Sequence, residues 1–314
     1  MSGTMHAARG HRRGGPEQLV YELAPRPVSG PGEVLVAVRA ASVTTGELGW
    51  DATWTDSFDG SGGPRLPIVP SKEVSGVVAE LGEGVTDFAP GDEVYGLIPF
   101  TRDGAAAEYV TVPAAVLAAK PRSLDHERTA ALPLAGLTAW QGLAAHAGVA
   151  PGQRVLVHGG AGGVGSFVVQ VAAALGAEVT ATAAARDADF VRGLGAETVI
   201  DYAGRRFEDE VKDADVVFDT VGGDTLDRSW RVLRPGGVLV GIVAPPAPPA
   251  GVDARGVFFV VEPDRAGLDQ LSALVEAGRL VPQIDRVVPL ESAPEAYAAL
   301  EREHRRGKIV LRIS

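Results

Sequence analysis

The residues best suited to chemistry are glycines near the middle of the chain, spaced Gly-x-Gly-x-x-Gly. An apolar run at 155–157 precedes them and an apolar segment at 166–175 follows, which predicts a strand, a tight turn and a helix. Glycine lets the backbone approach a pyrophosphate, and a helix N-terminus offers free N–H groups to it. The pattern therefore predicts dinucleotide binding; the alternative is a plain turn that binds nothing. The expected phosphate-binding turn comprises Gly160, Gly162, Gly163, Val164 and Gly165.

The residues after the next expected strand bear on which nicotinamide is bound. NAD sites usually place an acidic side chain there to hold the ribose diol. Here the strand is followed by Thr182 and Arg186, and an acid first occurs at Asp187. A hydroxyl and a guanidinium suit a 2′-phosphate, so we expect NADPH. The alternative has Arg186 pointing at solvent and Asp187 reaching the ribose.

The elements that would position these residues differ along the chain. Short strands at 33–43, 73–81, 92–98 and 107–112, among Pro and Gly, predict an antiparallel β domain. After Pro121 an Ala- and Leu-rich helical stretch at 128–148 leads into alternating strands and helices. Strands are expected at 155–157, 178–181, 198–200, 216–218, 238–242 and 257–261. This alternation predicts a doubly wound parallel sheet. The final strand, 308–313, is a candidate to return to the first domain.

Composition excludes several classes of function. The 314 residues carry a formal net charge of −11, which argues against nucleic acid or an anionic membrane as a partner. Cysteine is absent, so disulfides, thiol nucleophiles and thiolate zinc sites are excluded. We find no signal peptide and no apolar stretch long enough to cross a bilayer, and expect a cytoplasmic location.

Several further motifs occur in the order found in one known family. With the glycine turn they resemble the medium-chain dehydrogenase/reductase superfamily, and within it the zinc-independent quinone and enone reductases. The resemblance covers almost the whole chain. The motifs are Pro70-x-x-Glu73-x-Ser75-Gly76, Gly91-Asp92-Glu93-Val94-Tyr95-Gly96, Gly136-Leu137-Thr138-Ala139, Leu194-Gly195-Ala196, Phe218-Asp219-Thr220-Val221-Gly222-Gly223 and Gly307-Lys308.

The resemblance implies an α/β protein of two domains. A GroES-like catalytic and substrate domain would span 1–122, completed by 264–314, and a Rossmann NADP-binding domain would span 123–263. It also implies a homodimer through the last Rossmann strand, 257–261, since exposed edge strands need covering. The residues it adds to the expected cofactor site are Thr138 near the nicotinamide, Tyr202 near the adenosine phosphate, and Val221, Ile242, Phe259 and Lys308.

The same resemblance bears on metal. Zinc-dependent relatives bind their catalytic metal through a cysteine after the second strand and a Gly-His-Glu segment. Here these positions read Thr44 and Ser71-Lys72-Glu73, and the cysteines of a structural zinc lobe are absent too. A zinc site needs at least three good ligands. We therefore expect no metal.

Four residues are candidates for the chemistry. Lys72 stands where relatives place a metal-binding histidine, so its ammonium could polarise a carbonyl; alternatively it forms an ion pair with Glu47 or Glu73. Thr44 stands where many enone reductases carry asparagine. Trp50 and Trp54 form either a substrate wall or the anchor of a long loop.

His158 ends the first Rossmann strand, and we interpret it as a buried, hydrogen-bonded imidazole. The other histidines form no spaced set of metal ligands.

Three readings of function follow. The leading one is NADPH-dependent reduction of a quinone or an α,β-unsaturated carbonyl, with hydride supplied by the cofactor. The second is a recruited biosynthetic enzyme that couples reduction to cyclisation or rearrangement. The third is a non-enzymatic binding protein.

Overall fold

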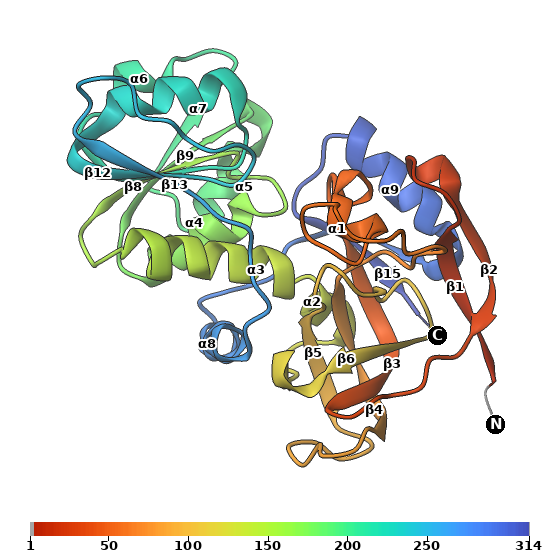
Figure 1. The fold of residues 1–314 in the computed structure, drawn as a ribbon. Helices are drawn as coiled ribbons and strands as arrows, with labels where there is room; N and C mark the ends of the chain where they lie inside the picture. The colour runs from red at the N-terminus through yellow and green to blue at the C-terminus, as the bar shows by residue number, and fades with distance from the viewer. Residues whose placement is uncertain (1–2, 314) are drawn as a thin grey trace. The chain divides into compact units, whose positions relative to one another are not determined.

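The computed structural model describes residues 3–313, which divide into two compact units (Figure 1). The first contains the described residues up to Leu134, together with 262–276 and 282–313. The second contains 135–261 and 277–281. No helix within residues 3–313 is long and apolar enough to cross a membrane.

The first unit is built on a mostly antiparallel sheet in the order β14-β15-β3-β4-β5-β7, with β6 also paired to β3. Its strands are β3 (Glu33–Val43), β4 (Glu73–Leu81), β5 (Glu93–Leu97), β6 (Tyr109–Pro113), β7 (Leu117–Ala119), β14 (Ile284–Pro289) and β15 (Lys308–Arg312). A separate hairpin pairs β1 (Thr4–Gly10) with β2 (Leu19–Pro25). The helices are α1 (Asp51–Trp54), α2 (His126–Ala130), α8 (Arg265–Glu276) and α9 (Ala293–Arg302).

The chain's last strand completes this first sheet. β15 runs antiparallel to β3, with Ile309 opposite Val43, which confirms that the C-terminal strand returns to the N-terminal unit. Alternate residues of β3, such as Val34 and Val36, enter a core shared with side chains of α9. Other residues of β3 are buried too, among them Leu35 and Ala40, so β3 is a central strand that is covered on both faces.

The second unit holds a six-stranded parallel sheet in the order β10-β9-β8-β11-β12-β13. Its strands are β8 (Arg154–His158), β9 (Glu178–Ala183), β10 (Thr198–Asp201), β11 (Ala214–Asp219), β12 (Leu233–Gly241) and β13 (Ala254–Phe258). Figure 1 shows α6 and α7 on one face and α4 on the other. The helices are α3 (Pro133–Trp140), which begins in the first unit, α4 (Gly165–Ala174), α5 (Ala188–Gly193), α6 (Phe207–Glu210) and α7 (Gly223–Ser229).

The observed architecture confirms the expected fold class, a GroES-like β domain with a doubly wound parallel sheet. The division of the chain falls after Leu134, whereas the sequence-based boundary was placed at 122/123. The difference includes α2, because its last residue, Ala130, and the following Ala131 pack against Ala40 of β3 and Val310 of β15. Asp125 caps this helix by accepting a hydrogen bond from the Arg128 amide.

Two expected elements have different bounds in the structure. The helical stretch at 128–148 is interrupted: α2 ends at Ala130, α3 restarts at Pro133, and 141–147 continues as a π-helix. Proline is favoured in the first turn of a helix because it has no N–H to satisfy, so a new helix begins there.

The expected last parallel strand is present, but its bounds of 257–261 were wrong, because β13 spans Ala254–Phe258. The apolar residues at 257–261 had predicted a strand there. Pairing with β12 instead starts at Ala254 and includes Gly256. This position needs glycine, because a Cβ there would lie 2.2 Å from the carbonyl oxygen of Pro246.

Candidate active site and coenzyme site

The glycine turn joins β8 to α4 in the expected way. Gly159 adopts a positive φ of 76°, and the Gly160 amide donates to the Thr182 carbonyl at 2.9 Å. A Cβ on Gly165 would lie 2.0 Å from the carbonyl oxygen of Gly159, so only glycine fits where the helix begins. No side chain caps α4 at Val164. The amides of Ser166, Phe167 and Val168 donate to the carbonyls of Gly162 and Val164, so the start of α4 offers a phosphate the positive partial charge of a helix N-terminus.

His158, at the end of β8, directly precedes the glycine turn and is linked to it through Thr182. It is fully buried, with Nδ1 3.1 Å from the Thr182 hydroxyl and Nε2 3.0 Å from that of Ser229. Burial lowers its pKa to about 3, so the imidazole is neutral at physiological pH. This confirms the interpretation of a buried, hydrogen-bonded histidine. Thr182, expected at the cofactor, also accepts a hydrogen bond from the Gly159 amide at 3.3 Å.

The end of β9 carries the residues expected to distinguish the two nicotinamide cofactors. Arg186 is exposed, whereas Asp187 is only 1% exposed. Tyr202 lies on the neighbouring strand end, because its amide donates to the Ala183 carbonyl at 3.3 Å, and its side chain is 62% exposed. Arg186 and Tyr202 are therefore exposed to solvent at this edge of the sheet, whereas the carboxylate of Asp187 is buried.

The remaining cofactor candidates of the second unit lie beyond the ends of other parallel strands, except for Thr138, which is buried in α3. Val221 follows β11 and is exposed, while Ile242 follows β12 and is half-buried. Phe259 follows β13, with its ring centroid 4.5 Å from that of His146. The carboxyl ends of parallel strands form the edge where such folds bind ligands.

Lys308 was expected at the cofactor, but the contacts described for it belong to the first unit. It is 5% exposed, and its ammonium donates to Glu73 Oε2 at 2.5 Å and to Thr44 Oγ1 at 3.1 Å. The Thr44 hydroxyl in turn donates to the same carboxylate oxygen at 3.2 Å, and the Leu134 amide donates to Glu73 Oε1 at 3.0 Å. The structure therefore brings Thr44, Glu73 and Lys308 together; we call these the Lys308 cluster.

Lys72 lies beside this cluster in the sequence but has other partners. It is 1% exposed, and its ammonium donates to the Arg102 carbonyl. Burial lowers its pKa to about 8, an effect that the charge of Glu47 opposes. Glu47 is itself fully enclosed and accepts hydrogen bonds from the Ser71 amide and the Tyr297 hydroxyl, each at 2.7 Å.

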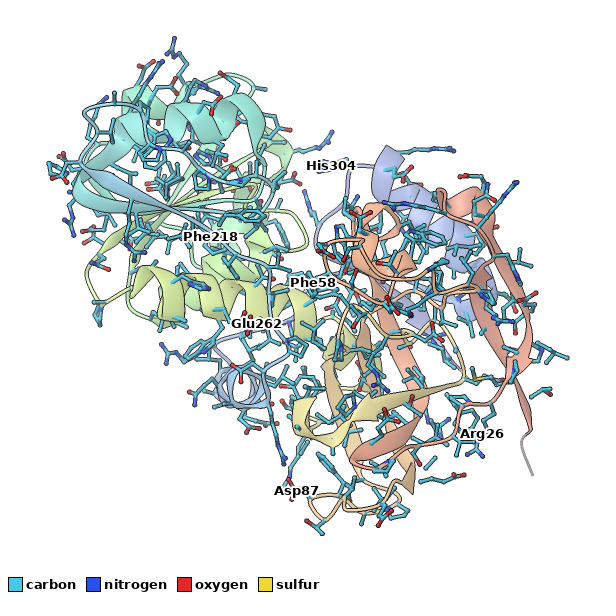
Figure 2. The ribbon with its side chains drawn as sticks, in the orientation of Figure 1. Arg26, Phe58, Asp87, Phe218, Glu262 and His304 are labelled. Atoms are coloured by element: carbon cyan, nitrogen blue, oxygen red, sulfur yellow. The ribbon has the colours of Figure 1, made fainter. Side chains whose placement is uncertain are left out.

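The two tryptophans have different environments. Trp54 is buried, and its indole N–H donates to the Leu48 carbonyl at 2.7 Å, which anchors the loop. Trp50 is partly exposed and meets Phe100 edge to face at a centroid distance of 5.4 Å. Phe58, labelled in Figure 2, also meets Phe100 edge to face, at a centroid distance of 5.7 Å, and is largely exposed. Of the two tryptophans, Trp50 therefore has the geometry of a wall.

Sequence reasoning missed parts of this site. Phe58 and Phe100 were overlooked because isolated aromatics in a loop carry no periodic signal. The contacts of Lys308 were missed because they join residues more than 230 positions apart. The Gly307-Lys308 motif was the only signal that could have pointed to them.

The residues at the positions of the relatives' zinc ligands do not fit a catalytic zinc ion. They offer a hydroxyl (Thr44), an ammonium (Lys72) and a carboxylate already paired with a second ammonium (Glu73). Zinc requires thiolate, imidazole or free carboxylate donors, and a neighbouring cation repels it. Among residues 3–313, no group of three or more His, Asp or Glu side chains could hold a metal ion.

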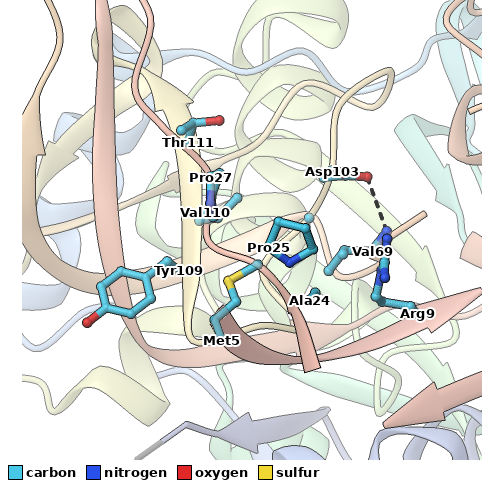
Figure 3. Close-up of a pocket in the computed structure, with 11 residues that line it drawn as sticks. Met5, Arg9, Ala24, Pro25, Pro27, Val69, Asp103, Tyr109, Val110 and Thr111 are labelled. Carbon is cyan, nitrogen blue, oxygen red and sulfur yellow. Dashed lines mark hydrogen bonds between the residues drawn. The ribbon is translucent and has the colours of Figure 1, made fainter. Parts of the chain in front are cut away.

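A separate pocket of about 250 Å³ also lies in the first unit (Figure 3). Its lining residues include Arg9, Asp103 and Tyr109 and none of the site residues expected from the sequence. The Arg9 guanidinium is paired with Glu22 at 3.0 Å. The pocket is therefore distinct from the Lys308 cluster.

Comparisons with known proteins identify relatives along most of the chain. Two family models match, an alcohol dehydrogenase GroES-like domain over 30–122 and a zinc-binding dehydrogenase domain over 194–311. The mouse (Mus musculus) protein named NAD(P)H oxidoreductase RTN4IP1, mitochondrial, is 34% identical over 90% of this chain and 82% of its own length. An NADPH-dependent alkenal/one oxidoreductase, chloroplastic, of Arabidopsis thaliana is 36% identical over 78% of this chain and 64% of its own length.

The solved structures agree. The quinone oxidoreductase from Coxiella burnetii matches with a TM-score of 0.88 at 30% identity, covering 99% of this chain and all of that one.

One expectation is corrected by these comparisons. The cytoplasmic location expected from the sequence is contradicted, because the mouse relative is named as a mitochondrial protein. That expectation had rested only on finding no targeting segment, and such a finding does not identify a compartment.

Proposed function

The chain belongs to the medium-chain dehydrogenase/reductase superfamily of oxidoreductases and uses a nicotinamide cofactor, and we propose that it is a zinc-independent, NADPH-dependent reductase of α,β-unsaturated carbonyls or quinones. The observation that carries this proposal is the Lys308 cluster. At two of the positions where zinc-dependent relatives place metal ligands, this chain has the hydroxyl of Thr44 and the carboxylate of Glu73, and both are hydrogen-bonded to the buried ammonium of Lys308. A hydroxyl beside a fixed positive charge can stabilise an enolate, which forms when hydride adds to a conjugated carbon.

The choice of NADPH is supported by the end of β9. Exposed Arg186 and Tyr202 can contact a 2′-phosphate, through a charge-assisted hydrogen bond and through packing against the adenosine end. Buried Asp187 is poorly placed to hold a ribose diol, which is the acidic residue's role in NAD sites. The Gly160–Gly165 turn would hold the pyrophosphate, with Thr138, Val221, Ile242 and Phe259 toward the nicotinamide.

The substrate class is supported by the names of two relatives. One is an alkenal/one oxidoreductase and the other a quinone oxidoreductase, and both kinds of acceptor take hydride next to a conjugated carbonyl. Trp50 and the rings of Phe58 and Phe100 would form an apolar wall for a flat acceptor. We assign the polar contact with the carbonyl oxygen to Thr44 rather than Lys72, because Thr44 is partly exposed.

We also propose the domain roles and the assembly. The GroES-like part would bind the acceptor and the Rossmann part the cofactor. A homodimer would form through the edge strand β13, whose outward Phe258 is 44% exposed. An unpaired strand edge beside apolar side chains favours pairing with a second copy.

The experiment that tests this function is a titration of the purified protein with NADPH and NADH, followed by nicotinamide fluorescence. An aliphatic enone and a quinone are then added separately to the bound complex. The proposal predicts tighter binding of NADPH and its oxidation by at least one acceptor. Binding without oxidation by either acceptor would contradict the substrate class, and absence of binding would contradict the enzyme assignment.

A further inference from the structure

The Lys308 cluster is held in place by the sheet that carries it. Lys308 is the first residue of β15 and Glu73 the first of β4, while Thr44 directly follows β3. Both outer strands pair with β3, since Ile309 lies opposite Val43 and Ser42 opposite Glu73. The cluster's geometry is therefore fixed by backbone hydrogen bonds.

Burial divides the roles within the cluster. The Lys308 and Glu73 side chains are 5% and 0% exposed, whereas Thr44 is partly exposed. Taking an ion pair out of water is costly, and it persists where hydrogen bonds compensate it. Of the three side chains, Thr44 is the one that an acceptor in solvent can reach.

The Thr44 hydroxyl can donate its hydrogen bond to a substrate instead of Glu73. Glu73 Oε2 already accepts from the Lys308 ammonium at 2.5 Å, and Oε1 from the Leu134 amide at 3.0 Å, so the carboxylate stays satisfied if the hydroxyl turns away. The Thr44 oxygen would continue to accept from Lys308 at 3.1 Å. A hydroxyl that accepts from a cation becomes a stronger donor, because linked hydrogen bonds polarise one another.

We propose that Thr44 donates its hydrogen bond to the acceptor's carbonyl oxygen, and that Lys308 is a positioning residue that strengthens this donor. The inference rests on the proposed reduction. There the β-carbon of the enone receives a hydride from bound NADPH, and the C=C electron pair moves so that negative charge develops on the carbonyl oxygen. Water then supplies one proton to the α-carbon. The balance is enone, NADPH and H⁺ giving saturated ketone and NADP⁺.

This assignment differs from both sequence expectations for lysine. The Lys72 ammonium is directed to the Arg102 carbonyl and is 1% exposed, so it is not the cation that acts here. Lys308, expected to bind cofactor, would act on the substrate through Thr44.

The test is a double-mutant cycle on kcat, with the NADPH dissociation constant and melting temperature as controls. Thr44→Val should lower kcat with an enone about 100-fold or more, while Thr44→Ser stays within about threefold of wild type. The Lys308→Met/Glu73→Gln pair removes both buried charges and should also lower kcat. Adding Thr44→Val to that pair should cause little further loss, because the two changes interrupt one relay.

Each outcome decides between the alternatives. Independent, multiplicative losses in the cycle would overturn the role of Lys308, and full activity of Thr44→Val would overturn that of Thr44. If this pair does not fold, Lys308→Gln/Glu73→Gln, which also removes both charges but keeps polar side chains at the two positions, completes the cycle. A wild-type protein that oxidises NADPH with neither acceptor would overturn the proposed function together with this inference. An active wild type whose variants all keep the wild-type kcat would overturn the inference alone.

Discussion

Arg186 is the residue on which the choice of cofactor depends most. It is exposed just after the end of β9, and Tyr202, which follows the neighbouring strand β10, is exposed too. A hydrogen bond between a guanidinium and a phosphate contributes about 1.5–3 kcal/mol, so Arg186→Ala should weaken NADPH binding roughly 10- to 100-fold. Affinity for NADH should not change. Fluorescence titration measures both, with Arg192→Ala, which removes a surface arginine paired with Asp189, as the control. Equal loss for the two cofactors would contradict the assignment.

His158 makes stability depend on pH in a defined direction. Its pKa is lowered to about 3 by burial, against 6.5 for the free side chain, so the unfolded state binds the extra proton between these values. Stability must therefore fall as pH falls below 6.5, by about 2 kcal/mol at pH 5 from this group alone. Urea unfolding at pH 7 and pH 5 measures the loss. His158→Asn should be less stable than wild type at pH 7, but its free energy of unfolding should fall less between pH 7 and pH 5. A decrease as large as that of wild type would contradict this role of His158.

At the scale of elements, the turn from β8 into α4 is the most constrained. Gly165→Ala would place a Cβ 2.0 Å from the Gly159 carbonyl oxygen. The turn must distort, so we expect loss of more than about 2 kcal/mol of stability together with NADPH binding. Gly193→Ala is the matched control, because it lies in α5 and its Cβ would meet nothing within 4 Å. It should stabilise the protein by about 0.5–1 kcal/mol. Unfolding curves with and without NADPH separate the two variants.

Most of the strands and helices could be predicted from the sequence. The parallel strands and the glycine turn were identified because buried strands and helix starts leave local patterns. The position of β13 was not, because its register is set by β12 and by the approach of Pro246 to Gly256. The interruption at Pro133 was likewise concealed by a continuous apolar composition.

The candidate catalytic residues could be predicted only in part. Thr44 was named as a candidate, but the pairing of Glu73 with Lys308 joins two strands that the sequence does not align. The Tyr297–Glu47 hydrogen bond joins residues 250 positions apart and has no local signature. The roles of Thr44, Glu73 and Lys308 stay predictions, which the double-mutant cycle tests.

At the scale of the whole molecule, the open question is assembly through β13. This strand ends the second unit's sheet, and the outward Phe258 would be covered in a dimer. Phe258→Asp would place charges of the same sign at such an interface and should give monomers in light scattering after size exclusion. Leu23→Asp, at an exposed apolar position in β2, is the control and should leave the mass unchanged. A wild-type monomer at micromolar concentration would refute the proposed dimer.

In the proposed reaction, the whole molecule transfers hydride from NADPH to a carbon conjugated with a carbonyl. The most direct measurement uses NADPH deuterated at C4, in each of its two stereoisomers, with an aliphatic enone and analysis of the product by NMR and mass spectrometry. The account predicts one deuterium at the β-carbon, from one stereoisomer only, and a solvent-derived proton at the α-carbon. A saturated product without deuterium, or consumption of NADPH with no reduction of the enone, would contradict it.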